Sequence, residues 1–91
     1  MLRLNRMTDY AILVLGVMAA RPDEILASAA LAQHTQLNQT TVAKVTKTLV
    51  SAGLVVSTRG IKGGYYLDRP VNNISIAEVI EAVEGPIALT A

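Results

Sequence analysis

The first strongly apolar region of the chain lies between Asp9 and Ala20, and its pattern predicts a helix. Thr8 followed by Asp9 is typical of a helix start, because a hydroxyl caps free backbone N–H groups and an acid is favoured beside them. Pro22 ends the segment soon afterwards. Residues 12–18 leave almost no polar face, so we expect helix 9–20 to be buried on every side. Part of it should pack against something outside these 91 residues, such as a partner subunit.

Two further helical patterns follow, and together they predict a helix-turn-helix. Residues 28–34 predict a short helix, and a polar connector at 35–39 leads to a helix over 40–52, which Gly53 stops. In the short helix, the residues expected to point inward are Ala29, Leu31 and Ala32. In the longer helix, apolar residues recur at spacings of three and four, namely Val42, Val45, Leu49 and Ala52. The opposite stripe is polar or basic throughout, namely Thr40, Lys44, Lys47 and Ser51.

The remaining pattern predicts a β-hairpin and a last helix. β-branched and aromatic residues predict strands over 54–58 and 64–69, with Arg59 and Lys62 at the hairpin tip. Ser75 and Glu78 form a capping box that predicts a helix over 75–83. Its expected inward face is Ile76, Val79, Ile80 and Val83. The order of helix, helix, helix, hairpin and helix predicts a mainly α fold with a small β-hairpin, a winged helix-turn-helix.

Length and composition limit the class of protein. Ninety-one residues make one small domain, which we place at 1–85. No apolar run reaches the roughly 18–20 residues that span a bilayer, and residues 11–20 lack the features of a signal peptide, so we expect a cytoplasmic protein. The chain has no cysteine, which rules out a disulfide framework or a thiolate metal site within these residues.

The net charge of +1 hides an uneven distribution of charged residues. The basic residues of segment 25–67 are Lys44, Lys47, Arg59 and Lys62, and this segment has no carboxylate. The segments on either side are neutral or acidic. The basic block falls on helix 40–52 and on the hairpin tip, which indicates a surface that faces a polyanion. A lysine-bearing helix face is often only solvated, but surface helices usually mix both signs of charge and this one does not.

The stretch TRGIKGGYYL, residues 58–67, holds three of the six glycines and allows two interpretations. A phosphate-binding loop of the Walker type would place its lysine before a Ser or Thr that begins a helix. Here Lys62 precedes Gly63 and Gly64, and a β-rich segment follows. The glycines therefore permit a tight hairpin turn, and Arg59 at its exposed tip is suited to a narrow minor groove.

Enzymatic interpretations find little support in the sequence. His34 is the only histidine, and it lies at a helix end, where a capping or solvated role is more common. Three glutamates at spacings of three, Glu78, Glu81 and Glu84, suggest a solvated acidic helix flank rather than catalytic carboxylates or a metal site. We expect a protein that is not an enzyme.

Four segments in this order resemble a known family: TDYAILVLG, TTVAKVTKTLVSAGLV, TRGIKGGYYLDRP and ISIAEVIEAVEGPIALT. They resemble the iron–sulfur and nitric-oxide-sensing repressors of the IscR/NsrR type, and most closely the regulators of SUF iron–sulfur cluster assembly. The resemblance covers essentially the whole chain. One departure is Ala43-Lys44, where many relatives carry Glu-Gln on the recognition helix.

The resemblance implies a homodimer on a palindromic operator, with the third helix in the major groove and the wing arginine in the minor groove. It also implies that residues 86–91 begin a truncated cluster-binding and dimerisation segment with three cysteines further on. An iron–sulfur cluster is then expected in the full-length protein, and this cysteine-free chain cannot hold one through thiolates. Asp9 is a candidate fourth ligand, and an ordinary acid at a helix start is an equally good explanation of it.

The function expected from these observations is a DNA-binding transcription regulator that represses SUF-type iron–sulfur cluster assembly genes. Its partners would be double-stranded DNA and a second copy, with no membrane and no small-molecule substrate. The expected base-reading residues are Gln39, Thr40, Thr41 and Lys44. Phosphate contacts are expected from Lys47 and Ser51, with further candidates in Arg3, Arg6 and Ser28. On the wing, Arg59 should enter the minor groove, positioned by Lys62, Gly63 and Gly64. The alternative is a protein-interaction winged helix, in which Lys44 and Lys47 meet an acidic partner.

Overall fold

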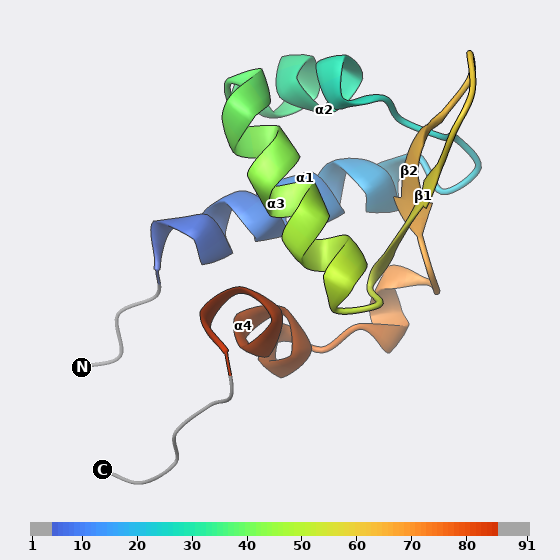
Figure 1. Ribbon diagram of the computed structural model, residues 1–91. Coiled ribbons are helices and arrows are strands. Elements are labelled where there is room, and N and C mark those ends of the chain that lie inside the picture. Colours follow the sequence, from blue (N-terminus) through green and yellow to red (C-terminus); the bar gives the residue numbers. More distant parts are fainter. Residues whose placement is uncertain (1–4, 86–91) are drawn as a thin grey trace, which may run out of the picture.

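The computed structural model describes residues 5–85 and shows four helices and one two-stranded antiparallel hairpin (Figure 1). The elements are α1 (Arg6–Ala20), α2 (Ser28–Thr35), α3 (Gln39–Ser51), β1 (Val55–Thr58), β2 (Gly64–Leu67), the 3-10 helix η1 (Val71–Asn73) and α4 (Ile76–Glu84). The predicted winged helix-turn-helix is confirmed. Predictions for Arg3 and for residues 86–91 lie outside the described residues. Within residues 5–85, none of the helices has the length and apolar character needed to cross a membrane.

The start of α1 differs from the prediction. The N-cap is Asn5, whose Oδ1 accepts a hydrogen bond from the backbone N–H of Met7 at 2.8 Å. Thr8, the predicted cap, lies inside the helix and is fully buried. Its hydroxyl donates to a carboxylate oxygen of Glu84 at 2.6 Å. Thr8 therefore connects α1 to the end of α4 instead of capping its own helix.

The core lies between the four α-helices and the base of the hairpin. Its buried hydrophobic residues are Ala11, Val14, Leu15, Met18, Leu26, Leu31, Val42, Val45, Leu49, Leu54, Val55 and Val79. The prediction that α1 is buried on every side holds for only one face within this chain, because Ile12 and Leu13 are 37% and 48% exposed. Ala29, Ala52 and Ile76, which were expected to point inward, are also exposed.

The hairpin strands are shorter than predicted. Residues 55–58 pair with 64–67 in antiparallel register, with Val55 opposite Leu67 and Thr58 opposite Gly64. Leu26 adds a bridge to Tyr65, with hydrogen bonds of 2.9 Å in both directions. A Cβ on Gly64 would lie 2.6 Å from the carbonyl oxygen of Leu26, so this close approach requires glycine. Gly64 therefore lets the wing lie against the segment around Leu26 that precedes α2.

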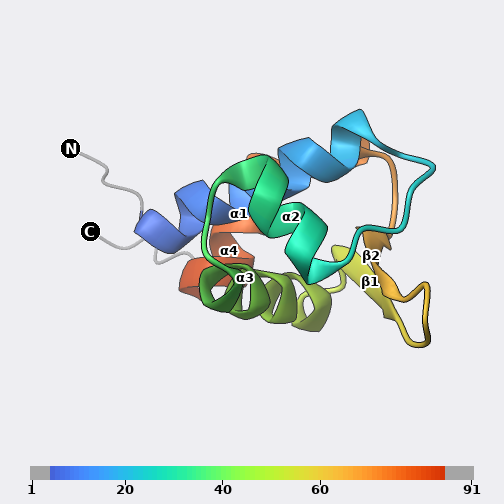
Figure 2. The same cartoon turned by 90° about the horizontal axis from the view of Figure 1, so that it is seen from above.

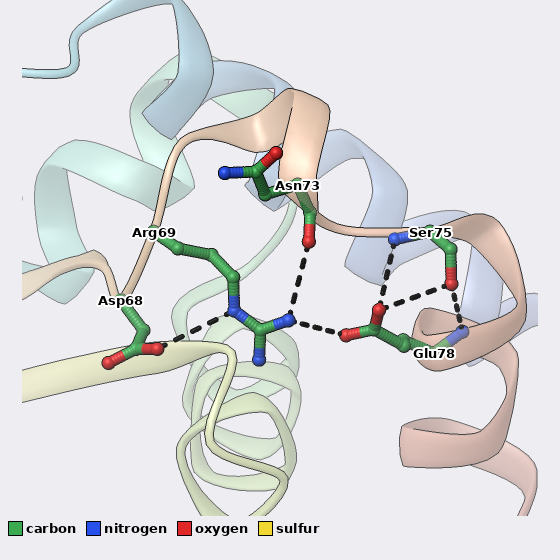
Figure 3. Close-up of polar contacts among 5 residues, drawn as sticks. All are labelled: Asp68, Arg69, Asn73, Ser75 and Glu78. Carbon is green, nitrogen blue, oxygen red and sulfur yellow. Dashed lines mark hydrogen bonds and ion pairs between the residues drawn. The ribbon is translucent and has the colours of Figure 1, made fainter.

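Asp68 and Arg69, predicted to end the second strand, instead leave the hairpin and connect it to α4 (Figure 3). Arg69 Nη1 donates to Glu78 at 2.8 Å and to the carbonyl of Asn73 at 3.3 Å, and its Nε lies 3.5 Å from Asp68. The predicted capping box is present, with Ser75 as N-cap and Glu78 at the third position. Glu78 thus stabilises both the start of α4 and the base of the wing, which corrects the expectation of a merely solvated flank.

Candidate nucleic-acid interface

The outer face of α3 carries the polar stripe that the sequence indicated. All four of its side chains are exposed, namely Thr40, Lys44, Lys47 and Ser51. We call these four residues the basic face. The opposite side of α3 is fixed in the core by Val42, Val45 and Leu49, each no more than 1% exposed. Because one side of the helix is held so firmly, the basic face has a defined orientation.

The N-terminal end of α3 begins one residue earlier than predicted, with Asn38 as its cap. Asn38 Oδ1 accepts a hydrogen bond from the backbone N–H of Thr41 at 2.7 Å. Gln39, which was placed in the connector, is the first residue of the helix, and its side chain is exposed. Thr41 is half-buried and so presents less of its surface than Gln39 or Thr40.

The turn between α2 and α3 sets the angle of the helix-turn-helix, and the sequence pattern did not reveal how. Gln36 adopts a positive φ of 65°, which is uncommon for a residue other than glycine. Thr35 supports the turn from within, because its hydroxyl donates to the carbonyl of Leu31 at 2.6 Å and accepts from the backbone N–H of Leu37 at 3.3 Å. A buried threonine on α3 was also missed: Thr46 is fully buried and donates to the carbonyl of Val42 at 2.8 Å.

The wing consists of β1, β2 and the tip at residues 59–63. Arg59 and Lys62 are exposed at this tip. Figure 2 shows α3 and the wing tip on the same side of the molecule, with α1 on the other side. The helix and the wing can therefore meet one extended partner together.

A groove of about 420 Å³ lies between the wing and the start of α2. Its lining includes Ser28 of α2, Ser57 of β1, Arg59, Gly63 and Gly64. The fold thus brings Ser28 into the same groove as the wing residues, although 31 positions separate Ser28 from Arg59. The predicted phosphate contact Ser28 and the predicted wing contacts therefore lie next to each other.

The charges of this side have no internal partners in the part of the chain that the structure describes. Within residues 5–85, the two ion pairs are both made by Arg69, to Asp68 and to Glu78. The basic residues of α3 and the wing tip, Lys44, Lys47, Arg59 and Lys62, are in none of them. Their positive charge is available to an external anion.

Two of the three carboxylates of α4, those of Glu78 and Glu84, are bonded to other parts of the molecule. Burial raises the pKa of Glu78, but hydrogen bonds from Arg69 and Ser75 and the charge of Arg69 outweigh it, so the pKa lies below its usual value. The hydroxyl of Thr8 and the backbone N–H of Asn5 lower the pKa of Glu84 in the same way. Glu84 belongs to α4, yet its carboxylate lies at the N-terminus of α1, where the helix dipole favours a negative charge. Glu81 is exposed.

The other predicted residues lie apart from the wing. Arg6 and Asp9 are exposed in the first turns of α1, at the end of the molecule away from the wing (Figures 1 and 2). His34 is exposed in the last turn of α2. Among residues 5–85, no three His, Cys, Asp or Glu side chains gather in a way that would hold a metal ion.

Comparison with known proteins identifies regulators of transcription. The sequence model of the Rrf2 family, described as "Iron-dependent Transcriptional regulator", matches residues 4–91. The HTH-type transcriptional regulator NsrR of Oceanobacillus iheyensis is 34% identical over 89 residues, which make up 97% of this chain and 60% of that protein. The chain spans about half the length of the curated relatives that it matches, with coverage between 50% and 60%.

Solved structures agree with this assignment. CymR (YrzC), the global cysteine regulator of B. subtilis, has a TM-score of 0.90 at 27% identity, covering 100% of this chain and 71% of CymR. IscR of T. potens shares the fold, with a TM-score of 0.83 at 24% identity, covering 99% of this chain and 66% of IscR. The resemblance to regulators of the IscR/NsrR type is confirmed, and the named relatives are regulators rather than enzymes, as expected. This chain belongs to the Rrf2 family of transcriptional regulators.

Proposed function

We propose that this chain is the DNA-binding domain of a sequence-specific transcription regulator, with α3 in the major groove and the wing in the adjacent minor groove. One observation carries the proposal. Four basic residues without a carboxylate partner in residues 5–85 lie on α3 and on the wing tip, which the fold places on one side of the molecule. The phosphate backbone of DNA supplies the complementary charge.

The roles of the residues on α3, on the wing and at Ser28 follow from their places on that side. At the N-terminal end of a recognition helix, base edges are within reach of Gln39, Thr40, Thr41 and Lys44. Further along the same exposed stripe, Lys47 and Ser51 contact phosphates, and Ser28 contacts a phosphate from the groove beside the wing. Arg59 enters the minor groove, and Lys62 holds the adjacent backbone. Arg6 and Arg3 are assigned further phosphate contacts on the grounds of their charge alone.

The full-length regulator binds a palindromic operator as a homodimer. The homodimer is supported by the exposed apolar side chains of Ile12 and Leu13 on α1, because burying large apolar side chains against a second subunit is favourable. We assign residues 1–85 to the DNA-binding domain and residues 86–91 to the beginning of a cluster-binding and dimerisation segment. Sedimentation equilibrium of the full-length protein tests the proposed homodimer, and a monomer at all concentrations would contradict it.

The proposal of an iron–sulfur cluster rests on the family and not on the residues of this chain. The family description refers to iron, and this chain has no cysteine. A cluster would therefore be held by residues beyond Ala91, with exposed Asp9 as a candidate ligand from the partner subunit. The regulated genes are proposed to be those of SUF-type cluster assembly, under repression. Loss of SUF transcript control after deletion of the gene is the expected result, and unchanged transcripts would contradict it.

The experiment that tests DNA binding compares two polyanions. Fluorescence anisotropy at low salt measures the affinity of the chain for a duplex of random sequence and for an acidic polyglutamate peptide. We expect binding to the duplex and much weaker binding to the peptide, because regularly spaced phosphates match both α3 and the wing. The opposite preference would favour the protein-interaction module with an acidic partner.

A further inference from the structure

The tip of the wing carries an isoleucine that the proposed function does not yet use. Ile61 has a relative exposure of 105%, which means that its side chain is fully open to solvent. The next most exposed large hydrophobic residue, Ile76, is 58% exposed. Ile61 is therefore the one large apolar side chain among residues 5–85 that stands wholly in solvent.

The turn that holds Ile61 is closely defined. The backbone N–H of Gly63 donates to the carbonyl of Gly60 at 2.9 Å, which closes a β-turn with Ile61 and Lys62 at its two corners. The N–H of Gly64 donates to the hydroxyl of Thr58 at 3.3 Å. A Cβ on Gly63 would lie 2.6 Å from the carbonyl oxygen of Thr58, so the two sides of the tip touch. Ile61 is consequently held at the outermost point of the wing.

An isoleucine is an unusual choice for this position if only the fold matters. Turn corners favour Gly, Pro, Asn, Asp and Ser, because these residues suit the backbone or hydrogen-bond to it. Ile61 offers neither advantage, and it adds no packing to the core. A residue that departs from local preference without benefit to stability points to a role in binding.

We propose that Ile61 enters the minor groove of DNA as an apolar wedge between Arg59 and Lys62. The groove has negatively charged edges and apolar sugar walls, so two cations around an apolar apex match it. Isoleucine is among the residues that other minor-groove proteins insert at base steps, which they partly unstack. Ile61 then confers a preference for flexible pyrimidine–purine steps, which are the easiest to unstack. This inference rests on the proposed DNA-binding function and deepens it.

The test uses a duplex that the wild-type chain selects from a randomised pool, with 2-aminopurine placed in turn at each step under the wing. Ile61→Ala should weaken binding by about fivefold to tenfold, because apolar contact is lost. The salt dependence should stay unchanged, since no charge is removed. The fluorescence rise of 2-aminopurine on binding, which reports unstacking, should fall. Ile61→Leu should retain most of the binding, and Ile76→Ala on α4 serves as the matched control.

Two results would overturn the inference in different ways. If Ile61→Ala binds within about twofold of the wild type and leaves the fluorescence rise intact, the wedge is wrong while DNA binding stands. If the wild-type chain selects no duplex at all, the proposed function fails and the wedge fails with it. Circular dichroism of each variant shows that the fold is retained, as expected for a residue without packing partners.

Discussion

On α4, the Glu78 carboxylate accepts hydrogen bonds from Arg69 and from its own N-cap, Ser75, and the Glu84 carboxylate accepts them from Thr8 and the backbone N–H of Asn5. On α3 and the wing tip, Lys44, Lys47, Arg59 and Lys62 form no ion pair within residues 5–85. The carboxylates thus hold α4 to the wing base and to α1, whereas the cations contribute no pairing to the fold. This difference teaches that the charges of Glu78 and Glu84 on α4 stabilise the domain, whereas the charges on α3 and the wing tip are left for a partner.

The comparison is tested most strongly at Arg59. Arg59→Ala should cost specific binding roughly 1–3 kcal/mol, by analogy with other base-groove contacts. Thermal unfolding should be unchanged, because Arg59 has no ion-pair partner among the described residues. Anisotropy with a duplex selected by the wild-type chain measures the affinity, and Arg59→Lys shows how much of the loss is due to charge alone. An affinity within error of the wild type would remove the arginine from the interface.

The stabilising role of the carboxylates Glu78 and Glu84 is tested by varying the pH. The pKa values of Glu78 and Glu84 are lowered in the folded state, so their stabilisation is present above the unfolded pKa and is lost as pH falls through the folded one. The wild type should therefore lose stability progressively below about pH 5. Glu84→Gln keeps an acceptor oxygen but has no charge. Its unfolding temperature should therefore lie below that of the wild type at pH 7 and approach the wild-type value at pH 3. DNA affinity at pH 7 should be unaffected.

A gap between wild type and Glu84→Gln that stays constant from pH 7 to pH 3 would contradict this assignment. It would mean that Glu84 acts through its shape or through hydrogen bonds that do not depend on its charge. Glu81→Gln, measured in the same way, provides the control, because Glu81 makes none of the side-chain hydrogen bonds found in residues 5–85.

The smallest effect is expected at Glu81, where α4 adjoins the basic face of α3. Glu81 lines a shallow groove together with Lys47 and Ser51, so a negative charge lies next to the basic face. Glu81→Gln should raise affinity for random duplex DNA by about twofold at low salt, because a charge that repels phosphate is removed. The gain should vanish at high salt. A loss of affinity would show that the acidic flank of α4 takes part in binding.

The sequence predicted the helix-turn-helix and the hairpin well, because their signals are local. Gly53 stops α3 almost where expected, and the paired glycines before Tyr65 mark the second strand. It also placed the basic face correctly, since helical spacing alone determines which side chains lie opposite Val42, Val45 and Leu49. These features depend on residues only a few positions apart.

The parts that the sequence misplaced depend on distant partners. Thr8 looks like a helix cap, but its hydroxyl is taken by Glu84, which lies 76 positions away. Arg69 looks like a strand end, but its partner is on α4. Ile76 fits the apolar pattern of α4 yet lies in its first turn, beyond the core that Val79 reaches. Periodicity says which residues share a face and not where that face meets the rest of the molecule.

The most direct test of the account is the salt dependence of binding to random duplex DNA by the wild type and Lys47→Ala. Arg21→Ala, which removes one charge at the end of α1 outside the proposed interface, is the matched control. If Lys47 neutralises a phosphate, the slope of log affinity against log salt should become shallower by about one unit in Lys47→Ala and stay unchanged in Arg21→Ala. Equal slopes for all three proteins would contradict the claim that the basic face of α3 binds DNA.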